Sequence, residues 1–236
     1  MKISIFGDSI AKGVIFNEDK NRYTFLKNCF FSITESALGV PMKNYAKFGC
    51  TVDKGTEIIN KHHDEISESD FTILEFGGND CDFNWAEIAE NPQADHTCQV
   101  PIDSFKSKYK SVIQGVFDLG TNPILMTLPP LCSRRFFDWI SRGLDKDNIM
   151  KFLNDDIFSI YRWHEEYNTK VLELAEEFKL PYIDIRSIFT DMDCYEDYIC
   201  IDGMHPNEKG HELISQEVIT QLETIIRCRK CSVNCA

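Results

Sequence analysis

The sequence has no apolar run long enough to cross a membrane. Its longest apolar stretches, such as ISIF and VIF, fall far short of the roughly 20 residues that a transmembrane helix needs. The amino-terminal stretch MKISIFGDS also lacks the apolar segment and the cleavage site of a signal peptide. We therefore expect a cytoplasmic protein that does not insert into a membrane.

Positive charge is scarce as well. The 236 residues include 25 Lys and Arg against 38 Asp and Glu, which gives a formal net charge of −13. Nucleic acid or an anionic membrane surface would meet a repulsive field, so neither is expected as a partner. This charge favours a neutral small molecule as the substrate. No feature of the sequence favours one oligomeric state over another.

Patterns that bind phosphate or a metal ion are missing or incomplete. Neither G-x-x-x-x-G-K-[ST] nor G-x-G-x-x-G occurs. The ten cysteines include Cys228, Cys231 and Cys235 in CRKCSVNCA, whose spacing could ligate zinc, but no second pair of ligands follows. We therefore predict reduced thiols, no metal and no cofactor.

No repeat, low-complexity stretch or linker divides the chain. Its length and its ordinary apolar content predict a single domain over residues 1–227. Residues 228–236 are predicted to form a cationic tail after the last helix.

Short apolar runs alternate with longer segments of helical periodicity. Five runs indicate buried parallel strands, at residues 2–7, 42–47, 71–76, 122–127 and 181–185. Helical patterns occupy residues 21–39, 104–120, 148–179 and 206–226. The alternation predicts one doubly wound sheet with helices on both faces, whose ligands bind beyond the carboxyl ends of the strands.

Three details of these helices can be predicted from single residues. Asn21 is expected to cap the first helix, and Pro206 is expected in the first turn of the last one. In the second helix, Phe117 belongs to the apolar stripe that should face the core.

Two segments are too long for ordinary connections between a strand and a helix. Residues 81–103 and 128–147 both leave the carboxyl end of a predicted strand, so we expect them to form walls of a substrate pocket. The second segment carries Phe136, Phe137 and Trp139, which are candidate pocket residues. The alternative, that these aromatic side chains extend the core, stays open.

Five residues of the predicted loops gather at the same edge of the sheet. They are Ser9, Gly49, Asn79, Asp202 and His205, in the segments FGDSI, KFGCT, GGND and IDGMHP. Each alone is ordinary: a serine or an asparagine caps helices, a glycine turns the chain, and a loop histidine implies little. Their joint placement favours a chemical role.

Acyl transfer needs residues of these types. A serine hydroxyl attacks poorly unless an imidazole takes its proton, and a carboxylate has to orient that imidazole. Asp202 and His205 supply this pair, and Gly203 lets the chain turn between them. Donors for the oxyanion that forms are available from the backbone N–H groups of Ser9 and Gly49 and from the side-chain amide of Asn79.

These segments resemble the conserved blocks of the GDSL, or SGNH, hydrolases. FGDSI is similar to the first block, Gly49 in YAKFGCTV to the second, GGND to the third and DGMHP to the fifth, with Ile10 in place of the leucine that gives the motif its name. The resemblance implies a three-layer α/β/α flavodoxin-like fold and metal-independent ester hydrolysis. It assigns Ser9 as nucleophile, His205 as base and Asp202 as its orienting group.

Other polar residues receive lesser roles. Asp8 and Asp80 are expected to hold the site loops by accepting hydrogen bonds from backbone N–H groups. His62, His63 and His211 are predicted to face solvent.

Several functions remain open from the sequence. The leading hypothesis is a serine esterase that cleaves small acyl esters, with acetylated sugars as candidate substrates. A longer-chain lipid or a thioester is the alternative substrate, because of the aromatic side chains near residue 136. From other classes, we consider a non-catalytic module that binds phosphate or flavin and a scaffold with an idle active site.

Overall fold

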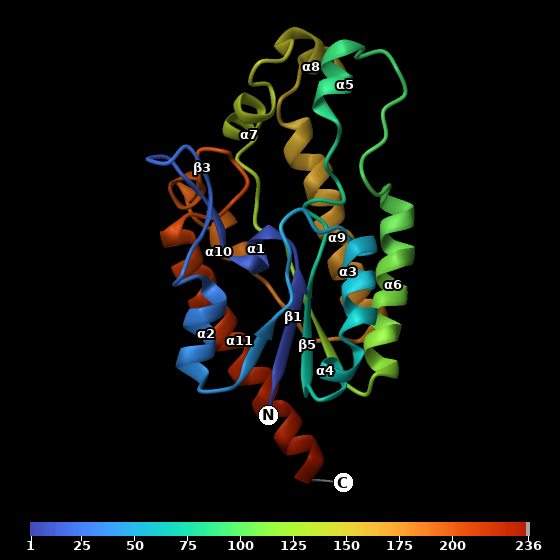
Figure 1. Ribbon diagram of the computed structural model, residues 1–236, viewed down its shortest axis with the longest axis vertical. Helices are drawn as coiled ribbons and strands as arrows, with labels where there is room; N and C mark the ends of the chain where they lie inside the picture. The colour runs from blue at the N-terminus through green and yellow to red at the C-terminus, as the bar shows by residue number, and fades with distance from the viewer. Residues whose placement is uncertain (235–236) are drawn as a thin grey trace.

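The computed structural model describes residues 1–234, with side chains to residue 229. A five-stranded parallel sheet runs through the middle of the molecule, in the order β4-β1-β5-β6-β7, with helices on both faces (Figure 1). The strands are β1 (Ile3–Gly7), β4 (Met42–Asn44), β5 (Phe71–Glu75), β6 (Asn122–Met126) and β7 (Tyr182–Ile183). The predicted α/β fold with a five-stranded parallel sheet is confirmed.

The central strands are apolar on both faces because helices cover both. In β1, Ile5 belongs to the apolar cluster on one face, and Phe6 belongs to the cluster on the other face. Their partners in β5, Ile73 and Leu74, divide in the same way. A strand buried on both sides therefore reads as a continuous apolar run.

Each face of the sheet has its own set of helices (Figure 1). One face is covered by α2 (Phe30–Leu38) and α11 (Glu208–Asn234), with the short α1 (Ser9–Lys12) and α10 (Ser187–Thr190) beside them. The other face is covered by α3 (Val52–Lys61), α4 (His63–Ser67), α6 (Ile102–Asp118) and α9 (Ser159–Phe178).

A group of short helices lies beyond the carboxyl ends of the strands, at the top of Figure 1. It comprises α5 (Trp85–Glu90), α7 (Ser133–Ile140), α8 (Lys146–Phe152) and the first turns of α9. The helices α5 and α7 lie within the two long segments that the sequence sets apart. We call this group the upper helices.

A two-stranded antiparallel hairpin replaces the first part of the helix predicted over residues 21–39. Its strands are β2 (Val14–Asn17) and β3 (Arg22–Phe25), and α2 begins only at Phe30. Asn21 has a φ of 46° and belongs to the hairpin turn, so its predicted role as helix cap is wrong. The hairpin forms because Tyr23 packs against Phe16 and Trp139, contacts that helical periodicity does not show.

The long helix predicted over residues 148–179 is two helices. The chain leaves the helical conformation at Asn154 and Asp155, which have φ values of 55° and 57°, and α9 begins at Ser159. In the helix predicted over residues 104–120, Phe117 is 38% exposed and so does not join the buried stripe.

Both ends of the last helix also differ from the prediction. The side chain of Asn207 accepts the N–H of Gly210 and so caps α11, which places Pro206 before the helix. Pro206 pairs there with Ile199 in an isolated bridge. The helix runs on to Asn234.

The predicted tail is therefore largely helical, with Cys228 exposed on α11. Cys235 and the side chain of Cys231 lie outside the described residues. No described helix is long and apolar enough to span a membrane. The structure adds a 3₁₀ helix, η1 (Tyr195–Tyr198), before the segment that carries Asp202.

Candidate active site

Ser9 is presented by a tight turn between β1 and α1. It is the first residue of α1, and Asp8 caps that helix by accepting the N–H of Ile10 at 2.8 Å. The turn packs directly on β5: a Cβ atom at Gly7 would lie 2.6 Å from Glu75 Oε2. Glycine at this position therefore lets the serine loop sit close to the neighbouring strand.

Asp202 and His205 are fixed by the loop between η1 and α11. Asp202 Oδ1 accepts the backbone N–H groups of Met204 and His205 at 3.0 and 3.1 Å. Gly203 has a φ of 75°, and a Cβ atom there would lie 2.3 Å from the backbone nitrogen of Phe136. The sequence between Asp202 and His205 thus folds into a compact turn that packs against the start of α7.

The three side chains form a continuous hydrogen-bonded chain. His205 Nδ1 lies 2.6 Å from Asp202 Oδ2, and His205 Nε2 lies 2.8 Å from Ser9 Oγ. Burial works to raise the pKa of Asp202, but hydrogen bonds from His205 and from two backbone N–H groups hold it below its usual value. An ionised Asp202 fixes the proton of the imidazole on Nδ1, which leaves Nε2 free to accept a proton from Ser9.

Asn79 and Ser9 both line a cavity, whereas Gly49 does not. Asn79 Nδ2 donates one hydrogen bond to Asp8 Oδ2 at 2.9 Å, which fixes the orientation of its amide. Gly49 has a φ of 68° in the loop after β4 and is not among the residues that line the cavity. Its neighbour Phe48 stacks on the imidazole of His205, with ring centroids 6.2 Å apart.

Asp8 and Asp80 both hold loops of the site through backbone N–H groups. Asp80 Oδ1 accepts the N–H of Val52, the first residue of α3, at 2.9 Å. Burial raises the pKa of Asp80 to about 7 and also raises the pKa of Asp8.

Glu75 is a buried carboxyl group of the site that sequence reasoning missed. It accepts the N–H of Asp8 at 3.1 Å and lines the cavity. Burial, and then the charge of Asp8, raise its pKa well above the usual value. The available signal was an acidic residue at the end of an otherwise apolar strand, FTILE.

A cavity of about 340 Å³ opens beside Ser9 and His205. Both long segments contribute to it, through Cys81, Asp82, Phe83 and Trp85 and through Leu128, Pro129, Leu131 and Phe136. The last turn of α8 and the first turns of α9 complete the wall with Phe152, Leu153, Ile160, Trp163 and His164, which sequence reasoning missed because their helical pattern resembles that of core residues.

Of the three candidate pocket residues, only Phe136 lines this cavity. Phe137 is buried in the apolar cluster of the upper helices. Trp139 packs edge-on against Phe16 of the hairpin, with ring centroids 4.6 Å apart. Part of this aromatic segment therefore forms the pocket wall, as predicted, and part of it packs in apolar clusters, as the alternative held.

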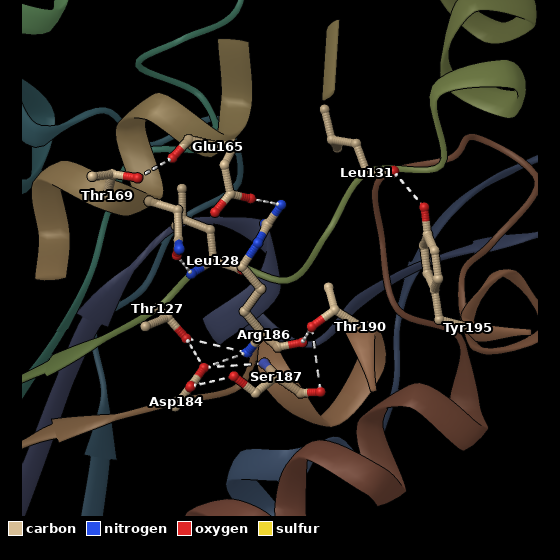
Figure 2. Close-up of polar contacts among 11 residues, drawn as sticks. Thr127, Leu128, Leu131, Glu165, Thr169, Asp184, Arg186, Ser187, Thr190 and Tyr195 are labelled. Atoms are coloured by element: carbon tan, nitrogen blue, oxygen red, sulfur yellow. Dashed lines mark hydrogen bonds and ion pairs between the residues drawn. The ribbon is translucent and has the colours of Figure 1, made fainter. Parts of the chain in front are cut away.

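The side chains of Arg186 and Tyr195 hold the backbone of the cavity wall after β6 (Figure 2). Arg186 donates to the carbonyl of Leu128 at 3.3 Å and forms an ion pair with Glu165 of α9. Tyr195 donates to the carbonyl of Leu131 at 3.1 Å. These contacts position the wall without charging its inner surface.

Two aromatic rings cover the other side of the imidazole. Tyr23 of β3 lies 5.2 Å from His205 between ring centroids, and Phe48 is 54% exposed beside it. Burial, and then the charge of Asp202, raise the pKa of Tyr23. Sequence reasoning missed Tyr23 because the segment that carries it has helical periodicity, and the only signal for Phe48 was its place next to Gly49.

The remaining histidines differ in part from expectation. His211, predicted to face solvent, is fully buried on α11, and burial lowers its pKa to about 4. His62 is half-buried against the ring of Tyr45 at 4.5 Å, whereas His63 is exposed. Among the residues that the structure describes, no group of three or more His, Cys, Asp or Glu side chains could hold a metal ion.

Comparisons with known proteins bear on the fold and the family. A family model described as GDSL-like lipase/acylhydrolase matches residues 3–218. No match was found among curated proteins. A lipase/acylhydrolase from Enterococcus faecalis has a similar structure, with a TM-score of 0.67 at 20% identity over 94% of this chain and 95% of that one.

Two esterases of known structure are also similar. One is an acetyl-xylooligosaccharide esterase from Geobacillus stearmophilus, with a TM-score of 0.62 at 16% identity over 93% of each chain. The other is a psychrotrophic esterase from Pseudoalteromonas, with a TM-score of 0.62 at 12% identity over 96% of this chain and 98% of that one. At these identities the likeness shows the fold.

Proposed function

The chain belongs to the GDSL-like lipase/acylhydrolase family, and from that premise we propose that it hydrolyses carboxylic esters through an acyl-enzyme intermediate. The observation that carries the proposal is the chain of hydrogen bonds from Ser9 Oγ through His205 to Asp202, with contacts of 2.8 and 2.6 Å. These are the distances at which an imidazole can take a proton from the attacking hydroxyl.

In the first half of the reaction, Ser9 Oγ attacks the ester carbonyl carbon while its proton passes to His205 Nε2. The tetrahedral intermediate carries an oxyanion, which we assign to donors from the Ser9 and Gly49 backbone N–H groups and the Asn79 side-chain amide. His205 then donates its proton to the alcohol oxygen as the bond to carbon breaks, and the acyl group stays on Ser9.

In the second half, water replaces the alcohol. His205 takes a proton from the water, whose oxygen attacks the acyl carbon, and the proton returns to Ser9 Oγ as the carboxylic acid leaves. Throughout, Asp202 stabilises the imidazolium and keeps the ring in position. These steps use the ester, water, and the side chains and backbone N–H groups named above.

The similar fold of an acetyl-xylooligosaccharide esterase supports small acyl esters, and acetylated sugars among them, as candidate substrates. The cavity beside Ser9 supports the alternative of a longer acyl chain. A module that binds phosphate or flavin is disfavoured, because the buried carboxyl group of Asp8 already takes the free N–H at the start of α1.

The Ser9→Ala variant tests the proposal. With 4-nitrophenyl acetate as substrate we expect kcat/KM to fall by about 10³-fold or more, because the covalent step is lost and only binding and the oxyanion donors remain. Labelling by a fluorophosphonate probe should disappear with it. Ser111→Ala, on the exposed face of α6, is the matched control and should keep both properties.

A folded Ser9→Ala protein that still turned over the ester at the wild-type rate would refute the assignment. Failure of the folded wild-type protein to react with the probe would favour the idle scaffold.

A further inference from the structure

The requirement for proton delivery restricts how an ester can lie in the site. The alcohol oxygen has to come within hydrogen-bond reach of His205 Nε2, the atom that protonates it as it leaves. Tyr23 and Phe48 flank the imidazole without lining the cavity, and Phe48 is exposed to solvent. The cavity instead begins at Ser9 and extends toward the upper helices. Because both Ser9 and His205 line the cavity, an ester held at Ser9 can direct one of its two groups into the cavity and the other toward the exposed ring of Phe48.

The walls of the cavity are apolar for most of their extent. Beyond the residues around Ser9, they are formed mainly by aromatic and aliphatic side chains from four segments of the upper region, with Asn154 and Ser159 as uncharged polar members. The aromatic and aliphatic side chains are Phe83, Trp85, Leu131, Phe136, Phe152, Leu153, Ile160 and Trp163. Such a surface gains free energy by contact with hydrocarbon rather than with water.

The titratable groups in the wall do not change this character. Burial and then the charge of Arg186 lower the pKa of His164 to about 3, so its imidazole is neutral at physiological pH. The carboxyl group of Asp82 accepts the indole N–H of Trp85 at 2.9 Å and so already has a partner within the wall.

The volume is too large for an acetyl group. A methyl group is about the size of a water molecule, whose share of liquid volume is about 30 Å³, so it would fill roughly a tenth of a cavity of about 340 Å³. The rest would hold water against apolar side chains. On the same scale, an acyl group of about six to ten carbons would fill about half to nine-tenths of the space.

We propose that this cavity is the acyl-binding site and that the natural ester carries an apolar acyl group of about six to ten carbons. This inference rests on the proposed esterase function and specifies its substrate class. It places the specificity of the enzyme in the upper helices, whereas the catalytic side chains sit on the sheet loops. The acetyl group is then accepted only as a poor, short analogue.

The first test is a series of 4-nitrophenyl esters. Octanoate has six more methylenes than acetate, and each buried methylene is worth about fourfold in an equilibrium constant, so kcat/KM should rise by roughly 10²- to 10³-fold from acetate to octanoate. A wild-type kcat/KM that is equal or higher for acetate would overturn the proposal and leave the esterase function standing.

A variant that fills the cavity tests whether the preference for octanoate over acetate arises there. Ile160 is buried on α9 and lines the cavity, so Ile160→Phe should lower the ratio of kcat/KM for octanoate to kcat/KM for acetate at least tenfold. Ile58→Phe, on α3 and away from the cavity, is the matched control and should leave the ratio between the two esters unchanged. Equal losses on both esters with folded Ile160→Phe protein would count against the cavity as the acyl site.

A binding measurement on a variant that cannot turn over the ester tests the acyl-binding site separately from the proposed esterase function. Two of the three tryptophans, Trp85 and Trp163, line the cavity, so methyl octanoate added to Ser9→Ala protein should change the tryptophan fluorescence, whereas methyl acetate should not. If the wild-type protein hydrolysed none of the esters but the fluorescence response appeared, the esterase function would fail while the binding site stood. If methyl octanoate gave no response at concentrations up to its solubility, the binding site would fail.

Discussion

At the scale of single residues, three buried carboxyl groups besides Asp202 lie in the segments around Ser9, and no buried cation is among their described hydrogen-bond partners. Asp8, Glu75 and Asp80 are each at most 2% exposed. Backbone N–H groups satisfy part of their oxygen atoms, but Glu75 Oε1 and Asp80 Oδ2 have no partner among the described residues. Burial therefore favours the protonated form, and a neutral carboxyl group can stay in place without a counter-charge.

This arrangement predicts a pH-dependent stability that Asp80 controls. The folded protein holds the proton of Asp80 up to a pKa of about 7, whereas the unfolded chain releases it near 3.9. Between these values only the folded state is protonated. The contribution of Asp80 is therefore fully present below about pH 4 and decreases toward pH 7, by at most about 1.4 kcal/mol per pH unit.

Asp80→Asn removes this titration and keeps an oxygen that can accept the N–H of Val52. We expect the free energy of unfolding of the variant, relative to the wild type, to rise by about 1 to 3 kcal/mol between pH 4.5 and pH 7. Urea unfolding at several pH values measures it. Asp118→Asn, on the exposed part of α6, is the control and should show no such rise. A pH-independent difference for Asp80→Asn would show that Asp80 is ionised in the folded protein.

At the scale of elements, the turn between Asp202 and His205 depends on its contact with α7. Gly203 has a positive φ. Its backbone N–H donates to the carbonyl of Cys200, and its carbonyl accepts the backbone N–H of Cys132. A methyl group there would clash with the backbone at Phe136 and push the turn away from Ser9.

Gly203→Ala should therefore lower kcat/KM by about 10²-fold or more, because a displacement of about 1 Å at a catalytic group has an effect of this size. Gly120→Ala is the matched control: Gly120 also has a positive φ, of 80°, but no atom lies within 4 Å of its added Cβ. The control should lose some stability and keep its activity in the ester assay. Equal activity of the two folded variants would mean that the turn tolerates the added group.

The sequence predicts those elements whose signals are local. The strands that contain Ile5 and Ile73 are continuous apolar runs, and Asp202 and His205 lie within one short motif, so both could be identified from the chain itself. The hairpin could not, because Tyr23 is held in a strand by Trp139, more than a hundred residues away. Tertiary contacts there override the helical periodicity.

The same difference between local signals and tertiary contacts applies to the residues that line the cavity. The long segments predicted its position, but not which face of α7 is turned inward, so Phe136 lines it and Phe137 does not. His164 gave no signal because a histidine on a helix acquires its properties from its surroundings, here burial in the cavity wall and the charge of Arg186. The identity of lining residues is set by the packing of helices rather than by their sequence.

At the scale of the whole molecule, the upper helices share side chains with the sheet core. Phe83 packs both against the cluster of α3, α6 and α9 and against the cluster of α5, α7 and α8. The helix α9 runs through both regions, from Ile160 in the upper cluster to Leu174 in the core. Unfolding one region therefore exposes apolar surface of the other.

We predict that the upper helices and the sheet unfold together, as the single domain predicted over residues 1–227 requires. In urea, the tryptophan fluorescence reports on the upper helices through Trp85, and the far-ultraviolet circular dichroism reports on all helices. The two transitions should have the same midpoint. An earlier transition by fluorescence would instead identify the upper helices as a separate cooperative unit.

The bond between Ser9 and His205 joins residues that are 196 positions apart in the sequence. An intermediate in which β1 and β5 have paired would already hold Ser9 and Asn79 at one edge of the sheet, yet it would have no base. Incompletely folded chains therefore lack activity, which appears only when the turn at Gly203 packs against α7 and brings His205 to Ser9. During refolding from denaturant, the return of ester hydrolysis would time this final docking step rather than the collapse of the core.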